Sequence, residues 1–554
     1  MAAHANVTTL QRLARRHPGG KMRHGFSFMS AVAFVIASAF AHAASTTPAT
    51  KPDLARIHSD APGIAWFNGD VDAAFKAAQA ANKPVLLYWG AQWCPPCKQL
   101  KSAVFSRPDF IEKSKLFVAV YLDGDLPDAQ KWGDVFRVTG YPTVVVFKPD
   151  RTEITRIAGN MDLTLYARVL DDALGDVRPI KDVLALATRG EKPLAAADCR
   201  RLAYHAFDLE DEGVFKSETL LSAFENAARI CPANLAKERA RFSILAAAEA
   251  ATLQQAAIEK GGKADRELSV LIVRINELLA DQELAVANAD ALRGLPKAFY
   301  LAARQTLPQI SPGIRTRIMA VADATTANPQ FAPADQLAAQ LMKIRVAQAF
   351  AADGQVPTDV RSVALQTATK MLAVKQQPYV RAGVVNSAIN IYIALDDWTR
   401  ARDLLQLEAS TSNTPHYYLG DWADAEEHLG NEQRALELLA EAFAKARGPA
   451  SRFQWGYQYL DGLLRLAPDD TATIERVGLE VIRELDGPNR IHRRTLSRLT
   501  RLDQALRDWS STPQRAAVVA KFRAQVAAAC AKTPGDVATD AGCRNFGAPV
   551  AARR

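Results

Sequence analysis

Residues 85–98 of the chain read VLLYWGAQWCPPCK. The apolar run 85–89 predicts a short buried strand. The cysteine pair that follows is typical of a helix that begins beside its first cysteine, where free backbone N–H groups and the helix dipole lower the pKa of a thiol. The stretch therefore predicts a dithiol redox site, with Cys94 as the attacking sulfur and Cys97 as the resolving sulfur.

A zinc site and a purely structural disulfide are the alternatives for this cysteine pair. Zinc would need two further ligands, but the next cysteine is Cys199 and no histidine lies between His58 and His205. The nine histidines of the chain are scattered and form no metal-binding or catalytic-triad pattern. The sequence therefore predicts no metal and no cofactor.

The segments around the cysteine pair alternate between helical and strand-like patterns. Strands are predicted over 85–89, 116–122, 143–147 and 153–157, and helices over 70–81, from Cys94 onward, over 128–136 and over 163–174. Strands separated by helices, with a final hairpin, indicate an α/β domain. We place it at 63–178, after a linker at 44–62 that contains several Ser, Thr and Pro residues.

This domain resembles the thioredoxin superfamily, and within it the C-terminal domain of the bacterial thiol reductase DsbD. The resemblance rests on Lys83-Pro84-Val85, Trp93-Cys94-x-x-Cys97-Lys98, Gly140-Tyr141-Pro142-Thr143 and Gly159. It implies a thioredoxin fold, a cis peptide bond before Pro142 that faces the disulfide, and a substrate surface formed by Trp93, Tyr141, Pro142 and Thr143. A cis bond at this position is plausible because X–Pro bonds adopt the cis form at low cost.

One position departs from the pattern of that family. Thioredoxins commonly carry a buried aspartate six residues before the first cysteine, where it helps to deprotonate the resolving thiol, and this chain has Tyr88 there. Tyrosine, with a reference pKa of about 10, is a poor base at neutral pH. The departure predicts slower resolution of the mixed disulfide.

The two residues between the cysteines bear on the direction of the reaction. Strong oxidants of the family hold a histidine there, whereas Pro95 and Pro96 have neither a charge nor an N–H group. Weaker thiolate stabilisation makes the couple less oxidising, which favours a reductase or isomerase over a dedicated oxidase. The expected partners are protein substrates with cysteines and a membrane electron donor of the DsbD type.

The remainder of the chain, 179–554, differs in composition and in its pattern of apolar residues. Alanine is abundant, strand-like alternation nearly disappears, and prolines recur between helical patterns. A shift of 34 residues aligns 386–409 with 420–443, with identities at Leu395/Leu429, Arg400/Arg434, Ala401/Ala435, Leu404/Leu438 and Leu405/Leu439. This period resembles tetratricopeptide repeats. We expect an all-α helical-repeat domain that positions the substrate or docks the electron donor, with a non-repeating bundle as the alternative.

The other cysteines and a group of aromatic residues lie in this second part. Cys199 and Cys231 are predicted to link two helices, and Cys530 and Cys543 to pin the C-terminal tail, because exported proteins rarely keep free thiols. The alternative is that one pair relays electrons with the Cys94–Cys97 pair. Aromatic residues gather in one stretch, which we interpret as helical core rather than a binding groove: Trp398, Tyr417, Tyr418, Trp422, Trp455, Tyr457 and Tyr459.

The first 43 residues have the three parts of a secretory signal peptide: basic residues at Lys21 and Arg23, an apolar run over 26–40, and Ala41-His42-Ala43. The apolar run is shorter than the roughly 20 residues that span a bilayer, so cleavage is favoured over a retained anchor. In a bacterium this predicts a periplasmic protein with no stable membrane span.

An alternative function is a protein-binding scaffold in which the thioredoxin-like domain is accessory. The presence of Tyr88 in place of the family's aspartate favours this alternative.

The net charge of +8 belongs mainly to this leader. The leader contains five of the 68 basic residues and no acidic residue, so the rest of the chain has 63 basic and 60 acidic residues. A nearly neutral chain gives no support for a nucleic-acid partner.

Overall fold

The computed structural model describes residues 63–158, 163–175, 177–209, 215–261, 266–487, 490–533, 541–544 and 546. Residues 63–554 belong to one unit. The predicted signal peptide at 1–43, the linker at 44–62 and Gly159 lie outside the described residues.

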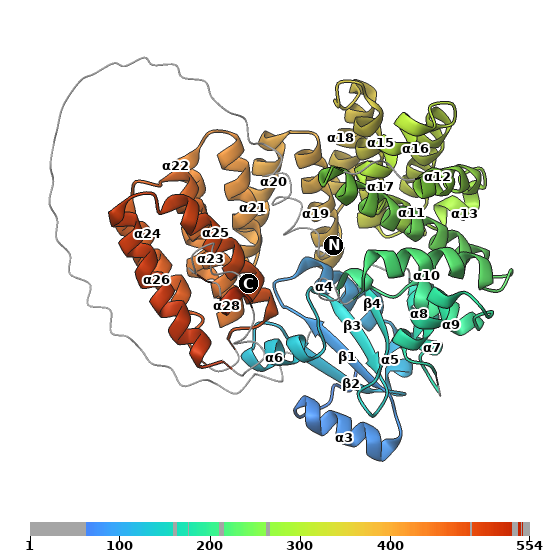
Figure 1. Ribbon diagram of the computed structural model, residues 1–554, viewed down its shortest axis with the longest axis horizontal. Helices are drawn as coiled ribbons and strands as arrows, with labels where there is room; N and C mark the ends of the chain where they lie inside the picture. The colour runs from blue at the N-terminus through green and yellow to red at the C-terminus, as the bar shows by residue number, and fades with distance from the viewer. Residues whose placement is uncertain are drawn as a thin grey trace. The chain divides into compact units, whose positions relative to one another are not determined.

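A mixed four-stranded sheet organises the first part of the described chain (Figure 1). Its strand order is β2-β1-β3-β4, with β1 parallel to β2 and the other neighbours antiparallel. The strands are β1 (Val85–Gly90), β2 (Val118–Asp123), β3 (Thr143–Phe147) and β4 (Glu153–Ala158). The helices around them are α3 (Val71–Ala81), α4 (Pro95–Leu100), the π-helix η1 (Lys101–Phe105), α5 (Pro108–Ser114), α6 (Pro127–Val135) and α7 (Leu163–Asp171). The predicted α/β architecture is confirmed.

Strand β1 lies in the middle of the sheet and is buried on both faces, as its apolar run requires. Alternate side chains point to opposite faces of a strand. Val85, Leu87 and Trp89 therefore join one core cluster with residues of α3 and α6. Tyr88 lies on the other face, where its ring meets Phe105 of η1 edge to face at 4.9 Å. The chain leaves this rigid strand and enters α4 at the cysteine pair.

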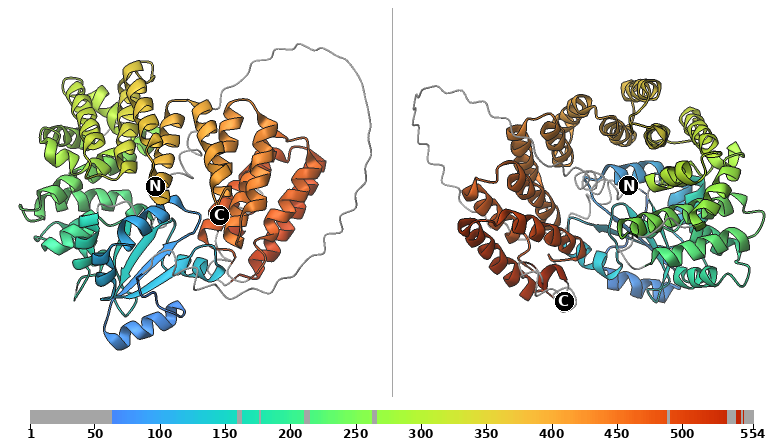
Figure 2. Two further views of the ribbon diagram at one scale, coloured as in Figure 1. Left: turned by 180° about the vertical axis from the view of Figure 1, so that it is seen from behind. Right: turned by 45° about the horizontal axis from the view of Figure 1, so that its top comes forward.

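From Ile180 onward the described chain is almost entirely helical, and we call α8 to α28 the helical region. Its elements are α8 (Ile180–Arg189), α9 (Ala196–Ala203), the 3₁₀ helix η2 (Phe207–Leu209), α10 (Ser217–Ile230), α11 (Ala236–Glu259), α12 (Arg266–Leu278), α13 (Gln282–Val286), α14 (Ala289–Arg293), α15 (Lys297–Thr306), α16 (Ser311–Ala327), α17 (Pro333–Phe350), α18 (Thr358–Ala373), α19 (Pro378–Ala394), α20 (Trp398–Thr411), α21 (His416–His428), α22 (Glu432–Lys445), α23 (Pro449–Leu466), α24 (Thr471–Arg483), α25 (Arg493–Trp509), α26 (Pro513–Ala531) and α28 (Ala541–Arg544). Consecutive helices from α16 to α24 pack side by side (Figure 2). The predicted all-α class of this region is confirmed.

The 34-residue spacing corresponds to two successive helix pairs, α19–α20 and α21–α22. The turn within each pair contains a residue with positive φ, Asp396 at 56° and Gly430 at 83°, and these two residues are 34 positions apart. The local pattern therefore repeats once in this stretch. A tetratricopeptide-like repeat over the whole region stays a prediction.

Two disulfides close within the helical region. Cys199 of α9 is joined to Cys231, which follows α10, with a Cα–Cα distance of 6.0 Å. Cys530 of α26 is joined to Cys543 of α28, with a Cα–Cα distance of 5.9 Å. Both separations lie in the usual range for disulfides. None of the helices in the described ranges is both long and apolar enough to cross a membrane.

Candidate functional site

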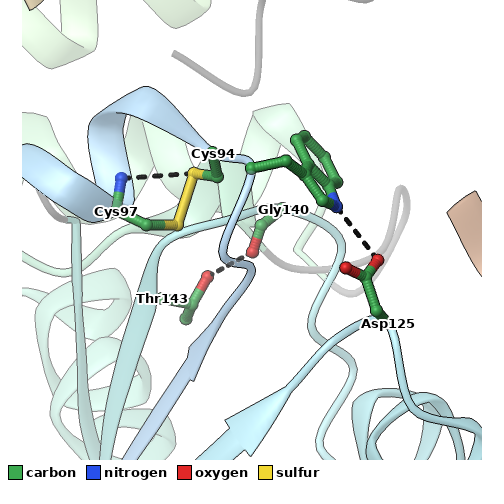
Figure 3. Close-up of a disulfide and its surroundings, with 6 residues drawn as sticks. Cys94, Cys97, Asp125, Gly140 and Thr143 are labelled. Carbon is green, nitrogen blue, oxygen red and sulfur yellow. Dashed lines mark hydrogen bonds between the residues drawn. A yellow bond between two sulfur atoms is a disulfide. The ribbon is translucent and has the colours of Figure 1, made fainter. Parts of the chain in front are cut away.

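The cysteine pair lies at the start of α4, directly after the central strand. Cys94 is the N-cap residue of α4 and forms a disulfide with Cys97, with a Cα–Cα distance of 5.2 Å. The backbone N–H of Cys97 donates a hydrogen bond of 3.2 Å to Sγ of Cys94 (Figure 3). Pro95 and Pro96 occupy the two positions between them and have no N–H to donate. The first turn of α4 therefore offers the attacking sulfur one backbone donor.

The residues assigned to the substrate surface lie around this disulfide. Trp93 and Tyr141 pack against the cysteine pair, and their rings meet edge to face at 5.7 Å. The Tyr141–Pro142 peptide bond is cis. Thr143 is buried at the start of β3, where its hydroxyl donates to the Gly140 carbonyl at 2.8 Å (Figure 3). The fold thus brings the separated motifs together, and their role in substrate binding stays a prediction.

Tyr88, at the position of the family's buried aspartate, belongs to an aromatic cluster. Its side chain is fully buried, and its ring stacks on that of Tyr121 with the centroids 5.2 Å apart. A Cβ atom on Gly90 would lie 2.4 Å from the Tyr88 hydroxyl oxygen, so this close approach requires glycine. The ammonium of Lys101 lies 5.2 Å from the Tyr121 ring centroid. The position where the family carries a buried aspartate is therefore surrounded by aromatic rings, with the charge of Lys101 beside the ring of Tyr121.

Residues of the helical region pack on Trp93. The indole of Trp455, on α23, meets the indole of Trp93 edge to face with the centroids 5.1 Å apart. The rings of Tyr417 and His416, at the start of α21, lie 6.1 Å and 6.5 Å from it. Tyr418, Trp422 and Trp455 are buried in the helical core, which agrees with the core interpretation. Tyr417 and Trp455 also contact Trp93, and although both stand in the aromatic stretch, no sequence pattern indicated this contact.

Asp125 connects the thioredoxin-like domain to the helical region. Its carboxylate accepts a hydrogen bond of 2.9 Å from the Trp93 indole (Figure 3) and another from the Ser451 hydroxyl. Burial raises the pKa of the Asp125 carboxyl, and the hydrogen bonds from Ser451 and Trp93 oppose that rise. No sequence motif marked Asp125 or Ser451, because they are 326 positions apart and lie in a loop and at a helix start.

Arg494, on α25, covers the other side of the site. Its guanidinium lies 4.5 Å from the centroid of the Tyr141 ring, within the range of a cation–π interaction. The Tyr141 hydroxyl donates to the Gly124 carbonyl at 3.2 Å and accepts from the Gln130 amide at 2.8 Å. Burial raises the pKa of Tyr141, and the charge of Arg494 opposes that rise. The ring is thus held in one position beside the disulfide.

His416 predicts a pH dependence of stability. Burial lowers the pKa of His416 to about 4, with help from the charges of Arg447 and Lys98. Because the unfolded side chain has a pKa of about 6.5, the folded state loses stability as the pH falls from about 6.5 towards 4. We expect a loss of about 2 kcal/mol from this group between pH 7 and pH 5. Denaturant titrations at the two pH values measure it.

The substitution His416→Phe tests this assignment because it keeps a ring against Trp93 and removes the titration. We expect a smaller loss of stability between the two pH values in this variant. The buried His492, whose pKa is lowered well below its usual value by burial, acts in the same direction and leaves part of the dependence. An unchanged dependence in His416→Phe would refute the assignment.

Comparisons with known proteins agree with this geometry. Residues 71–174 match the family described as a thioredoxin-like domain. The thiol:disulfide interchange protein DsbD of Cronobacter sakazakii is 36% identical over 112 residues, which cover 19% of this chain and 19% of that protein. A thioredoxin H-type of Oryza sativa subsp. indica is 33% identical and matched over 75% of its length, and a thioredoxin of Mycolicibacterium smegmatis is 31% identical and matched over 81%. Each of these two matches covers 17% of this chain. The chain therefore spans about a fifth of the DsbD relative and most of the two thioredoxins.

Proposed function

Because this chain belongs to the thioredoxin family, we propose that it is a thiol–disulfide oxidoreductase that exchanges disulfides with cysteine-containing proteins through Cys94 and Cys97. The observation that carries the proposal is the Cys94–Cys97 disulfide at the start of α4, beside Trp93 and the cis Tyr141–Pro142 bond. A dithiol at a helix start, next to a surface for an extended peptide, suits attack on a protein disulfide.

The proposed reaction begins with the reduced pair. The Cys94 thiolate attacks one sulfur of the substrate disulfide, forms a mixed disulfide and releases the other substrate sulfur as a thiolate. The Cys97 thiolate then attacks Sγ of Cys94, which releases the second substrate thiolate and forms the Cys94–Cys97 disulfide. Two electrons pass from the enzyme to the substrate, and a dithiol reductant must restore the reduced pair.

We further propose a reducing or isomerising direction and a periplasmic location. The prolines between the cysteines and the single N–H donor to Cys94 support the direction. The signal-like leader supports the location. A membrane electron donor of the DsbD type would supply electrons, and the helical region would position the substrate.

A trapping experiment tests the proposed activity. The variant Cys97→Ala stops the reaction at the mixed disulfide, because no sulfur remains to attack Sγ of Cys94. We expect disulfide-linked protein partners of this variant in periplasmic extracts, detected by non-reducing electrophoresis and identified by mass spectrometry. The double variant Cys94→Ala/Cys97→Ala is the matched control and should form no adduct.

The same experiment distinguishes the scaffold alternative, which the nearly complete burial of Cys94 favours. If partners bind equally well without either cysteine and no adduct forms, the helical region carries the function and the thioredoxin-like domain is accessory. Adducts that depend on Cys94 would instead support the enzyme and identify its substrates.

A further inference from the structure

The dithiol is almost completely covered within this chain. The side chains of Cys94 and Cys97 belong to residues that are 3% and 0% exposed. Thiol–disulfide exchange requires one sulfur to reach another. Cys94 therefore presents almost no surface to a sulfur from another protein.

The helical region contacts the surface that the sequence assigns to substrate. Trp455 and Tyr417 of the helical region pack on the ring of Trp93. Arg494 lies over the ring of Tyr141. Residues of the helical region therefore pack on both aromatic rings that flank the disulfide, those of Trp93 and Tyr141.

The backbone of the helical region also approaches the loop after β2 closely. Gly448, directly before α23, has φ of +77°, and a Cβ atom there would lie 2.6 Å from the backbone carbonyl oxygen of Asp125. The Ser451 hydroxyl donates to the carboxylate of the same aspartate. Only glycine allows this approach, because any side chain would push the loop and α23 apart.

Two further contacts extend the covered area. Helix α19 packs on α4, and a Cβ atom on its Gly383 would lie 3.1 Å from the side-chain oxygen of Gln99. At the other end of the site, the backbone N–H of Arg493 donates to the Asp134 carboxylate at 3.0 Å. Elements α19, α21, α23 and α25 thus all contact the face of the thioredoxin-like domain that carries the disulfide.

Each of these contacts is weak by itself. A hydrogen bond contributes about 1 kcal/mol net, and an aromatic pair about 0.5–1.5 kcal/mol beyond its buried area. Interfaces between parts of one chain that rest on such contacts separate by local opening, without unfolding the cores on either side.

We propose that α19, α21, α23 and α25 form a closing surface that must separate from Trp93, Asp125 and Tyr141 before any disulfide reaches Cys94. This rests on the proposed function and adds its regulation: Gly448, Ser451 and Trp455 control access to the attacking sulfur.

The test measures access to Cys94 in the full chain. In the Cys97→Ala background Cys94 is a free thiol, and the other two disulfides remain intact. Alkylation is followed by mass spectrometry with iodoacetamide and with a maleimide that carries a polyethylene glycol chain. For each reagent, the rate at Cys94 is divided by the rate at a cysteine in an unstructured peptide. Both reagents react with the thiolate of Cys94, so the fraction of thiolate cancels in the ratio of the two relative rates. We expect the bulky reagent to be slowed at least about 100-fold more than the small one.

A matched pair of glycine variants identifies the cause. In this background, Gly448→Ala places a methyl group against the Asp125 carbonyl, and we expect the bulky reagent to react at least about tenfold faster. Gly430 also has a positive φ, +83°, but no atom lies within 4 Å of its Cβ position. We expect Gly430→Ala to leave the rate unchanged. Ser451→Ala, which removes only a hydroxyl, should give a smaller increase and decides the matter if Gly448→Ala fails to fold.

The outcomes separate this proposal from the proposed activity. The closing surface is refuted if Cys94 of the parent is equally open to both reagents, or if the two glycine variants increase the rate equally. If Cys94 is protected and Gly448→Ala releases it, the closing surface stands even if trapping finds no Cys94-dependent adduct, and the proposed activity alone fails. Adducts formed by a fully accessible Cys94 would support the activity and overturn the closing surface.

Discussion

We expect the Cys94–Cys97 couple to have a reduction potential below about −200 mV, well below the value of about −120 mV of strongly oxidising disulfide donors. The reason lies in the reduced state. In the disulfide form, Sγ of Cys94 accepts one hydrogen bond from the first turn of α4, from the Cys97 N–H, and Cys94 is buried. We expect the same single donor and the same burial to leave the Cys94 thiolate weakly stabilised. When the thiolate of the reduced form is only weakly stabilised, reduction of the disulfide is less favourable. The couple is then a weak oxidant of other thiols.

Equilibration with glutathione buffers of known composition, followed by alkylation and mass spectrometry of the Cys94 peptide, measures this potential. Every 30 mV corresponds to about a tenfold change in the equilibrium constant of the two-electron couple. The expected difference from a strong oxidant therefore exceeds about 100-fold in that constant. A potential equal to that of the strong donors would overturn the proposed direction.

The variant Pro96→His tests the physical cause of the low potential. A histidine between the cysteines adds a positive charge and an N–H donor close to the Cys94 sulfur, so we expect the potential to rise by about 30 mV or more. The matched control is Pro513→His, because Pro513 also occupies the first turn of a helix, α26, but lies far from the cysteine pair in the sequence. We expect this control to leave the potential unchanged.

The second large effect is expected at Arg156 of β4, whose side chain is only 1% exposed. Its guanidinium donates to the carbonyls of Arg137 and Leu209, both at 2.9 Å, and of Phe136 at 2.7 Å. It also forms a salt bridge of 3.0 Å with Glu153. One side chain thus joins the sheet, the end of α6 and the η2 segment of the helical region.

We expect Arg156→Met to destabilise the protein by about 3–5 kcal/mol. The substitution leaves the Phe136 and Arg137 carbonyls and the Glu153 carboxylate without this donor, and the Leu209 carbonyl keeps only the Thr139 N–H. Removing one member of a buried ion pair usually costs this amount. Denaturant titration followed by circular dichroism measures the change. Arg168→Met on α7, where the arginine is exposed, is the control and should change stability by less than about 0.5 kcal/mol. A change of that small size in Arg156→Met would show that the network contributes little.

Local patterns in the sequence were enough to predict most of the secondary structure of the thioredoxin-like domain. The apolar runs of β1 and β3, the turn before β4 and the cysteine spacing act over a few residues, where backbone propensity and side-chain pattern decide the structure. The strands therefore lie within two residues of their predicted bounds. The π-helix η1 directly after α4 has no such local pattern and appears only in the structure.

The environment of the site could not be predicted in the same way. Trp455 has the spacing of a helical core residue, and it is one, so its pattern contains no sign that its edge also meets Trp93. Ser451 and Gly448 have no pattern at all. Their contacts with Asp125 depend on how the end of one helix approaches a distant loop.

The sequence by itself determined the chemistry: two cysteines at a helix start, a proline that can adopt a cis bond, and prolines that withhold N–H donors from the attacking sulfur. The tertiary structure decided the access to that chemistry. Helix periodicity says which face is buried but not which distant surface buries it, because that choice depends on the packing of whole helices against one another. For this chain, packing placed α21, α23 and α25 against Trp93, Asp125 and Tyr141.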